Sequence, residues 1–267
     1  MRRIEACFSA LQTAGKKALI PFITAGYPQP DQSVPLMHTL VRAGVDIIEL
    51  GIPFSDPMAD GPTIQRASEL ALQQGVRLQD VMAMVSEFRQ ENSKTPVVLM
   101  GYANPVEAMG VKAFAAAAAQ AGVDGVLIVD YPPEEAATFA MALKEVGLDL
   151  IFLLAPTSQQ ERIEHVATLA SGYIYYVALS GVTGSHNLNI EQIAQRLPAI
   201  RQTVRVPVGV GFGIRDADSA RRVACLADAV VVGSRIIECI EQAAGKDVCE
   251  HVYQLAAELR HGVDAAA

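Results

Sequence analysis

The sequence has no tryptophan, few cysteines and little charge. Charged residues make up 19% of its 267 residues, and neither the four cysteines nor the five histidines show a C-x-x-C or H-x-x-x-H spacing. Spacings of that kind are typical of structural metal sites and of disulfide-rich frameworks. We therefore predict reduced thiols and no metal site.

Long apolar runs and basic clusters are also missing. The alanine-rich stretch 113–121 is too short for a membrane span, which needs about 20 apolar residues. The polar residues near the start interrupt any export signal. The formal net charge of −8 argues against nucleic acid as a partner. These absences predict a cytoplasmic protein that binds neither membrane nor nucleic acid.

What the sequence does have is apolar residues, 51% of the total, gathered in short runs with helical stretches between them. Runs of this kind are typical of parallel strands that are buried on both faces. Eight of them recur along the chain: ALIPFITAG, VDIIELG, PVVLMGY, DGVLIVDY, DLIFLLAP, GYIYYVALS, PVGVGFG and DAVVVGS.

The repeat predicts an α/β fold, a single (β/α)8 (TIM) barrel domain over residues 1–267 with an extra N-terminal helix at 4–14. An open doubly wound sheet is the alternative, but no G-x-G-x-x-G follows the first run. The segments after the second and sixth runs, 52–96 and 181–189, are longer than the others. We expect extended loops there, at the end of the barrel where active sites lie.

Lysine is absent from the predicted strand ends. All six lysines lie before strands or on helices. Schiff-base aldolases and pyridoxal phosphate enzymes need an amine in the barrel mouth. Both classes are disfavoured, and chemistry by carboxylates remains.

Glu49 is the one ionisable residue in the middle of the second strand. Alternation places it on the same face as Ile47, near the carboxyl end of the strand. Burial there would raise its pKa toward the range of a general acid or base. The alternative is a structural glutamate that pairs with a nearby arginine.

The loop after Glu49 carries two aspartates. Asp56 lies between Ser55 and Pro57, a turn arrangement, and we interpret it as shaping the loop. Asp60 directly precedes Gly61-Pro62, where the next helix begins. It is either a second catalytic carboxylate or an ordinary N-terminal helix cap.

Glycine-bearing segments follow the sixth, seventh and eighth strands: SGVTG, GFG and GSR. In barrels of this kind, backbone N–H groups of such loops and a helix N-terminus bind phosphate. We predict a phosphorylated substrate held here, although each glycine alone could simply make a tight turn. The residues concerned are Gly184, Gly211, Gly213, Gly233 and Ser234.

The segment IELGIPFSDPMADGPTIQ, followed by SGVTG, GFGI and VVGS in that order, resembles the tryptophan synthase α-subunit family. The resemblance runs from about residue 18 to about residue 237. It implies a lyase of tryptophan biosynthesis that cleaves indole-3-glycerol phosphate to indole and glyceraldehyde 3-phosphate. It also implies that Glu49 and Asp60 are the two catalytic carboxylates.

The chemistry of that cleavage assigns a role to each group. Glu49 would move protons at the indole carbon and the side-chain hydroxyl, while ionised Asp60 would accept the indole N–H. Apolar strand-end residues would hold the ring, although each could equally be barrel core: Phe22, Met100, Tyr102, Leu127, Tyr175 and Phe212.

The resemblance further implies a partner, a β subunit that carries pyridoxal phosphate, in an α2β2 heterotetramer. No cofactor is expected in this chain. The loop with Ser55-Asp56-Pro57 and the segment 102–105 are similar to the family's partner-facing regions. The SGVTG loop is similar to its lid, with Thr183 bonding Asp60 on closure.

Two other functions stay open on the sequence alone. The glycine-rich segments by themselves fit another carboxylate-using barrel, such as an isomerase of the same route. The chain could also be a non-catalytic subunit that binds and switches a β-subunit enzyme.

Overall fold

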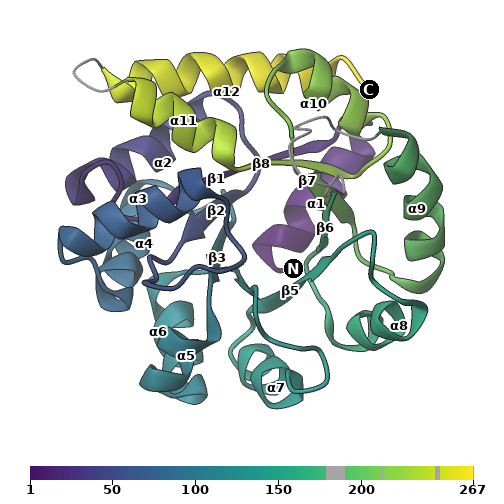
Figure 1. The fold of residues 1–267 in the computed structure, drawn as a ribbon, viewed down its shortest axis with the longest axis horizontal. Coiled ribbons are helices and arrows are strands. Elements are labelled where there is room, and N and C mark those ends of the chain that lie inside the picture. The colour runs from purple at the N-terminus through teal and green to yellow at the C-terminus, as the bar shows by residue number, and fades with distance from the viewer. Residues whose placement is uncertain (179–189, 212, 244–246, 267) are drawn as a thin grey trace.

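Parallel strands close into a barrel in the computed structural model of the protein, which describes residues 1–178, 190–211, 213–243 and 247–266 (Figure 1). Within these residues there are eight strands, each paired with its neighbours in chain order, and β8 pairs with β1. The predicted fold is confirmed, since every predicted run contains one strand. The strands are β1 (Ala18–Thr24), β2 (Ile48–Gly51), β3 (Val97–Gly101), β4 (Gly125–Ile128), β5 (Asp149–Leu154), β6 (Ile174–Val177), β7 (Val208–Gly211) and β8 (Ala229–Val232).

Helices surround the barrel and cover the outer face of the strands (Figure 1). Their apolar sides pack on the outward-facing strand residues, such as Ile48 and Leu50 of β2. The helices are α2 (Ser33–Arg42), α3 (Pro62–Gln73), α4 (Leu78–Glu91), α5 (Ala103–Met109), α6 (Val111–Ala121), α7 (Ala137–Glu145), α8 (Gln160–Leu169), α9 (Ile190–Thr203), α10 (Ala217–Ala224), α11 (Ser234–Gln242) and α12 (Val248–Asp264).

A second apolar cluster fills the inside of the barrel. Alternation turns every other strand residue inward, so Ile47, Val98, Leu127 and Ile151 meet there. The barrel is therefore a packed core and not a pore, and an inward side chain in its middle layers is cut off from water.

The extra N-terminal helix α1 (Arg3–Thr13) closes the N-terminal end of the barrel. Ile4 and Phe8 belong to the interior cluster. Arg2 forms an ion pair with Asp149 at the start of β5, and Arg3 forms a second with Asp124, at 2.8 Å. Apolar contacts and ion pairs thus hold α1 across the end of the barrel that is opposite the predicted active site.

The long segment between β2 and β3 differs from the extended loop that we predicted. Most of its length forms α3 and α4, and the loop itself covers only residues 52–61. Pro62 at the first turn and the buried Ala67 and Ala71 explain why a helix begins so early. The extended loop predicted at 181–189 lies outside the described residues.

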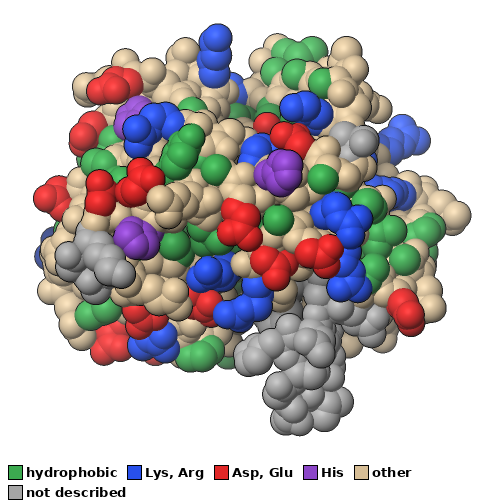
Figure 2. All heavy atoms as spheres, turned by 90° about the horizontal axis from the view of Figure 1, so that it is seen from above, with side chains coloured by type: hydrophobic (Ala, Val, Ile, Leu, Met, Phe, Trp, Pro, Cys, Tyr) green, Lys and Arg blue, Asp and Glu red, His purple; other side chains and the backbone are tan. Residues whose placement is uncertain are grey.

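The outer surface carries charges of both signs. On the face seen in Figure 2, acidic and basic side chains alternate over the described residues, with no large region of one sign. Within the described ranges, every helix is too short or too polar to span a lipid bilayer.

Candidate active site

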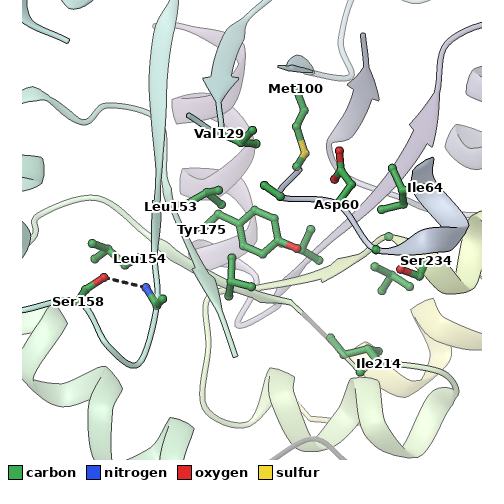
Figure 3. A pocket seen from close by; sticks show the side chains of 18 of the residues that line it. Asp60, Ile64, Met100, Val129, Leu153, Leu154, Ser158, Tyr175, Ile214 and Ser234 are labelled. Carbon is green, nitrogen blue, oxygen red and sulfur yellow. Dashed lines mark hydrogen bonds between the residues drawn. The ribbon is translucent and has the colours of Figure 1, made fainter. Parts of the chain in front are cut away.

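A pocket of about 850 Å³ opens at the carboxyl ends of the strands (Figure 3). Tyr175 reaches toward its centre, with Asp60 and Ile64 on one side and Leu153 on the other. Its size is that of a small-molecule site. Of the residues predicted from the sequence, it is lined by Asp60, Met100, Tyr175, Gly213, Gly233 and Ser234.

Glu49 faces the barrel interior, as alternation along β2 predicts. Its side chain is fully buried, and its Oε1 accepts a hydrogen bond of 2.5 Å from the Tyr173 hydroxyl. Its Oε2 has no hydrogen-bond partner among the described residues. Burial raises the pKa of the Glu49 carboxyl from 4.5 to about 7, against the lowering effect of the Tyr173 hydrogen bond. No arginine contacts this carboxyl in the part of the chain described, so the structural alternative is not supported.

Glu49 lies beneath the pocket and does not line it. The strand register places Glu49 between Phe22 of β1 and Val98 of β3. Phe22 lines a narrow recess beside the pocket, together with Tyr102 and Asp60, and the recess shares Asp60 and Met100 with the pocket wall. Phe22, which pairs in register with Glu49, therefore borders this recess.

Asp60 lies on the wall of both the pocket and the recess. The Tyr102 hydroxyl donates a hydrogen bond of 2.9 Å to its Oδ2. Burial raises the pKa of the Asp60 carboxyl above 3.8, and the hydrogen bond from Tyr102 lowers it. The N-cap of α3 is Gly61, with no side-chain cap, so the capping alternative for Asp60 does not hold.

The loop that carries Asp60 is fixed at several points. The backbone N–H and C=O of Phe54 both bond to the Ser68 hydroxyl of α3, at 2.8 and 3.0 Å. The Phe54 ring stacks on Tyr102, with ring centres 5.1 Å apart. Ser55 donates to Asp56 at 2.5 Å, which agrees with a loop-shaping role for Asp56.

The apolar residues predicted for the indole ring separate into two groups. Met100 and Tyr175 line the pocket, and Phe22 and Tyr102 line the recess. Leu127 is fully buried in the interior cluster and lines neither, so for this residue the barrel-core interpretation holds. The predicted contacts Phe212, Thr183 and Gly184 lie outside the described residues.

The residues predicted to bind the substrate phosphate lie around the start of α11. Gly233 and Ser234 begin this helix, whose first N–H groups have no partner within the helix. Gly213 joins them on the pocket wall, with a φ of +74° that favours glycine. Together these groups form a site where a phosphate fits.

Gly211 does not line the pocket, in contrast to the prediction. It is buried on β7, where a Cβ atom would lie 2.5 Å from the Tyr175 hydroxyl oxygen. Its lack of a side chain makes room for Tyr175, which does reach the pocket.

Sequence reasoning missed Tyr173 and the basic residues of the pocket. Tyr173 is two residues before Tyr175 and so on the same face of its strand, a signal that alternation could have revealed. Arg215 and Arg235 line the pocket, and Arg235 Nε donates to the Arg215 carbonyl at 3.2 Å. No lysine lines the pocket among the described residues.

The side chains of the described residues do not meet the requirements of a metal site. Within the described ranges, no group of three or more histidine, cysteine or acidic residues is placed to hold a metal ion. Each of the two predicted carboxyls accepts a hydrogen bond from a tyrosine, Asp60 from Tyr102 and Glu49 from Tyr173.

A closed parallel barrel with its pocket at the carboxyl ends of the strands defines a TIM-barrel enzyme. A family profile described as "Tryptophan synthase alpha chain" matches residues 8–264. The tryptophan synthase alpha chain of Dechloromonas aromatica (strain RCB) is 66% identical over 264 residues, which are 99% of this chain and 98% of that protein. That of Azoarcus sp. (strain BH72) is 61% identical, over 99% of this chain and 97% of that protein.

Solved structures agree. Tryptophan synthase subunit alpha from Legionella pneumophila str. Paris superimposes with a TM-score of 0.93 at 42% identity, over 99% of both chains. Mycobacterium tuberculosis tryptophan synthase superimposes with a TM-score of 0.88 at 37% sequence identity, over 98% of this chain and 98% of that chain. The chain belongs to the tryptophan synthase alpha chain family. This confirms the predicted activity, a carbon–carbon lyase that cleaves indole-3-glycerol phosphate in tryptophan biosynthesis, and implies a β subunit as partner.

Proposed function

We propose that Glu49 and Asp60 carry out the cleavage of indole-3-glycerol phosphate, on one barrel domain that covers residues 1–267. The observation that supports this most is the contrast between the two carboxyls. Glu49 is fully buried with a pKa of about 7, whereas Asp60 lies on the pocket wall beside Tyr102. Two carboxyls in different environments are suited to different proton states at one pH.

Glu49 is the proton-transfer group. In its protonated form it donates a proton to C3 of the indole ring. As the bond from C3 to the glycerol chain breaks, it accepts the proton of the adjacent hydroxyl, which becomes the aldehyde of glyceraldehyde 3-phosphate. The proton balance closes, and Glu49 is left protonated for the next cycle. The carboxyl has to turn from Tyr173 toward the recess for this step.

Asp60 is the fixed anion. Protonation at C3 places positive charge on the ring nitrogen, and an ionised Asp60 accepts the indole N–H and offsets that charge. The Tyr102 hydroxyl bonds to Oδ2, which orients the carboxylate and favours its ionised form. Activity therefore declines as the pH falls through the pKa of Asp60 and as it rises through that of Glu49.

The substrate phosphate binds at the start of α11. The N–H groups at this helix end, the backbone around Gly213 and Gly233, and the Ser234 hydroxyl support this placement. The guanidinium of Arg235, on the same wall, adds positive charge. Met100, Tyr175, Phe22 and Tyr102 would contact the indole ring, while Thr183, Gly184 and Phe212 stay predictions.

We further propose an α2β2 heterotetramer in the cytoplasm, with pyridoxal phosphate in the β subunit and no cofactor in this chain. The loop with Ser55 and Asp56 is exposed, and on the same loop Met58 is 86% exposed. The exposure of this loop leaves it accessible to a partner chain, as the family resemblance implies. The four free cysteines support a reducing compartment.

An assay of indole release tests the assignment. Purified chain is supplied with indole-3-glycerol phosphate, alone and with the β subunit. Glu49→Gln and Asp60→Asn should each lower kcat by about 100-fold or more, the range of a lost acid or base. Glu145→Gln, at the exposed end of α7, is the matched control and should keep full activity. Full activity in Glu49→Gln, or faster turnover of an isomerase substrate by the wild type, would contradict the assignment.

A further inference from the structure

A second large pocket lies at the N-terminal end of the barrel, opposite the candidate active site. Its volume is about 790 Å³, close to that of the active-site pocket. It is enclosed by α1, by the chain before β1, and by the segments that lead into β6, β7 and β8. Volumes of this size are typical of small-molecule sites. The cleavage reaction uses none of the residues that line it.

The charge of this second pocket is opposite to that of the whole chain. Five basic and three acidic side chains line it, in a protein of net charge −8. Two of the acids are already neutralised, since Asp149 pairs with Arg2, and Asp228 pairs with Arg201 at 3.0 Å. Lys17 and Arg205 form no ion pair within the described part of the chain. Glu5 is the third acid and forms no ion pair there either, so the unpaired groups are two cations and one carboxylate, and a net positive charge is left to attract an anion.

The rest of the wall is apolar. Side chains from α1 and from the segment before β7 form it: Phe8, Leu11, Val204, Val206 and Pro207. An apolar wall with cations beside it suits a small organic anion that has an apolar body, such as an aromatic carboxylate or sulfonate. An inorganic anion would leave the apolar part of the pocket unfilled.

The pocket is also connected to the buried carboxyl of the active site. Phe8 lines the pocket and contacts Tyr173 inside the barrel, with ring centres 6.0 Å apart. The Tyr173 hydroxyl in turn bonds to Glu49 Oε1 at 2.5 Å. Two contacts therefore join the second pocket to Glu49 and form a continuous packed route between them.

We propose that this pocket is a second ligand site for a small organic anion with an apolar body, and that its occupant acts on Glu49 through Phe8 and Tyr173. The binding half of the proposal is independent of the proposed function, whereas the coupling half rests on the role of Glu49. The two halves are measured separately.

Binding is tested on the full chain with 1-anilinonaphthalene-8-sulfonate as a fluorescent probe. Saturating indole and glycerol 3-phosphate keep the probe out of the active-site pocket. The double variant Lys17→Ala/Arg205→Ala should weaken binding by about tenfold or more, because it removes both unpaired cations that would contact the sulfonate. Lys112→Ala/Arg222→Ala removes the same two charges elsewhere and should bind as the wild type does. Equal binding by both double variants, or no binding by the wild type, would overturn the site.

Coupling is tested by indole release with and without the probe. The probe should change kcat/KM by about fivefold or more, the lower range of allosteric coupling. Tyr173→Phe keeps the ring against Phe8 but loses the bond to Glu49, so it should still bind the probe and lose the effect on the rate. If the probe changes kcat/KM in Tyr173→Phe as much as in the wild type, the proposed coupling is wrong. The coupling is also wrong if the wild type binds the probe without any change in kcat/KM. Neither result would affect the proposal that the pocket binds an anion.

Discussion

The Glu49→Gln variant is expected to gain stability over the wild type as the pH rises, by about 3 kcal/mol between pH 4.5 and pH 8. Burial raises the pKa of Glu49 from 4.5 to about 7, a difference of about 2.5. One pKa unit corresponds to about 1.4 kcal/mol, which leads to the value of about 3 kcal/mol. The side chain is fully buried, so solvent screening does not reduce it.

The sign follows from the proton balance. In the unfolded chain Glu49 loses its proton near pH 4.5, whereas in the folded chain it keeps it until about pH 7. The favourable contribution of the protonated group is complete below the unfolded pKa and is lost as the pH rises through the folded pKa. Glutamine is nearly isosteric, stays neutral, and can still accept the Tyr173 hydrogen bond. The Glu49→Gln variant therefore does not lose this stability as the pH rises.

Urea unfolding followed by circular dichroism measures the effect. Wild type and variant are compared at pH 4.5, 6 and 8, so that groups titrating in both cancel from the difference. Glu145→Gln, which removes an exposed charge, controls for net charge. A difference in unfolding free energy that is constant across the three pH values would refute the argument, because it would show that Glu49 titrates alike in both states.

Three further variants test individual contacts. Tyr173→Phe removes the hydrogen bond that lowers the pKa of the buried carboxyl, so the alkaline limb of the pH–activity profile should move above pH 7. Tyr102→Phe frees Asp60 from its only tyrosine donor within the described residues and should lower kcat/KM about tenfold, measured by indole release. Gly262→Ala would place Cβ 2.2 Å from the Ala217 carbonyl oxygen, so α10 and α12 must separate, and thermal unfolding should show a loss of about 1–3 kcal/mol.

The barrel could be predicted because each strand is buried on both faces and so appears as an apolar run. It was harder to predict whether the extra residues between β2 and β3 form a loop or helices. A loop and a helix of moderate polarity look alike by length, and only Pro62 and the buried Ala67 and Ala71 distinguish α3. Local spacing therefore predicts the units, while the amount of helix in an insertion depends on what the insertion packs against.

The site could be predicted in part for a related reason. Glu49 is ionisable in an apolar strand and so stands out, and alternation correctly places it inside the barrel. Its partner Tyr173 is 124 residues away, and no local pattern marks that contact. Gly211 and Leu127 both lie near strand ends, where the sequence leaves open whether a residue contacts the ligand or only serves a turn or the barrel core. Whether such a residue reaches the pocket depends on its neighbours, which for Gly211 means the Tyr175 ring.

The proton affinity of Glu49 has its origin outside the strand that carries it. Burial is the main cause of the raised pKa, and α1 helps to exclude water from the N-terminal end of the barrel. Ile4 and Phe8 of α1 pack into the interior cluster, and ion pairs at Arg2 and Arg3 hold the helix there. A helix that precedes the eight βα units thus helps to keep the Glu49 carboxyl away from water. The same contact of Phe8 with Tyr173 is the path by which the second pocket would act on the active site.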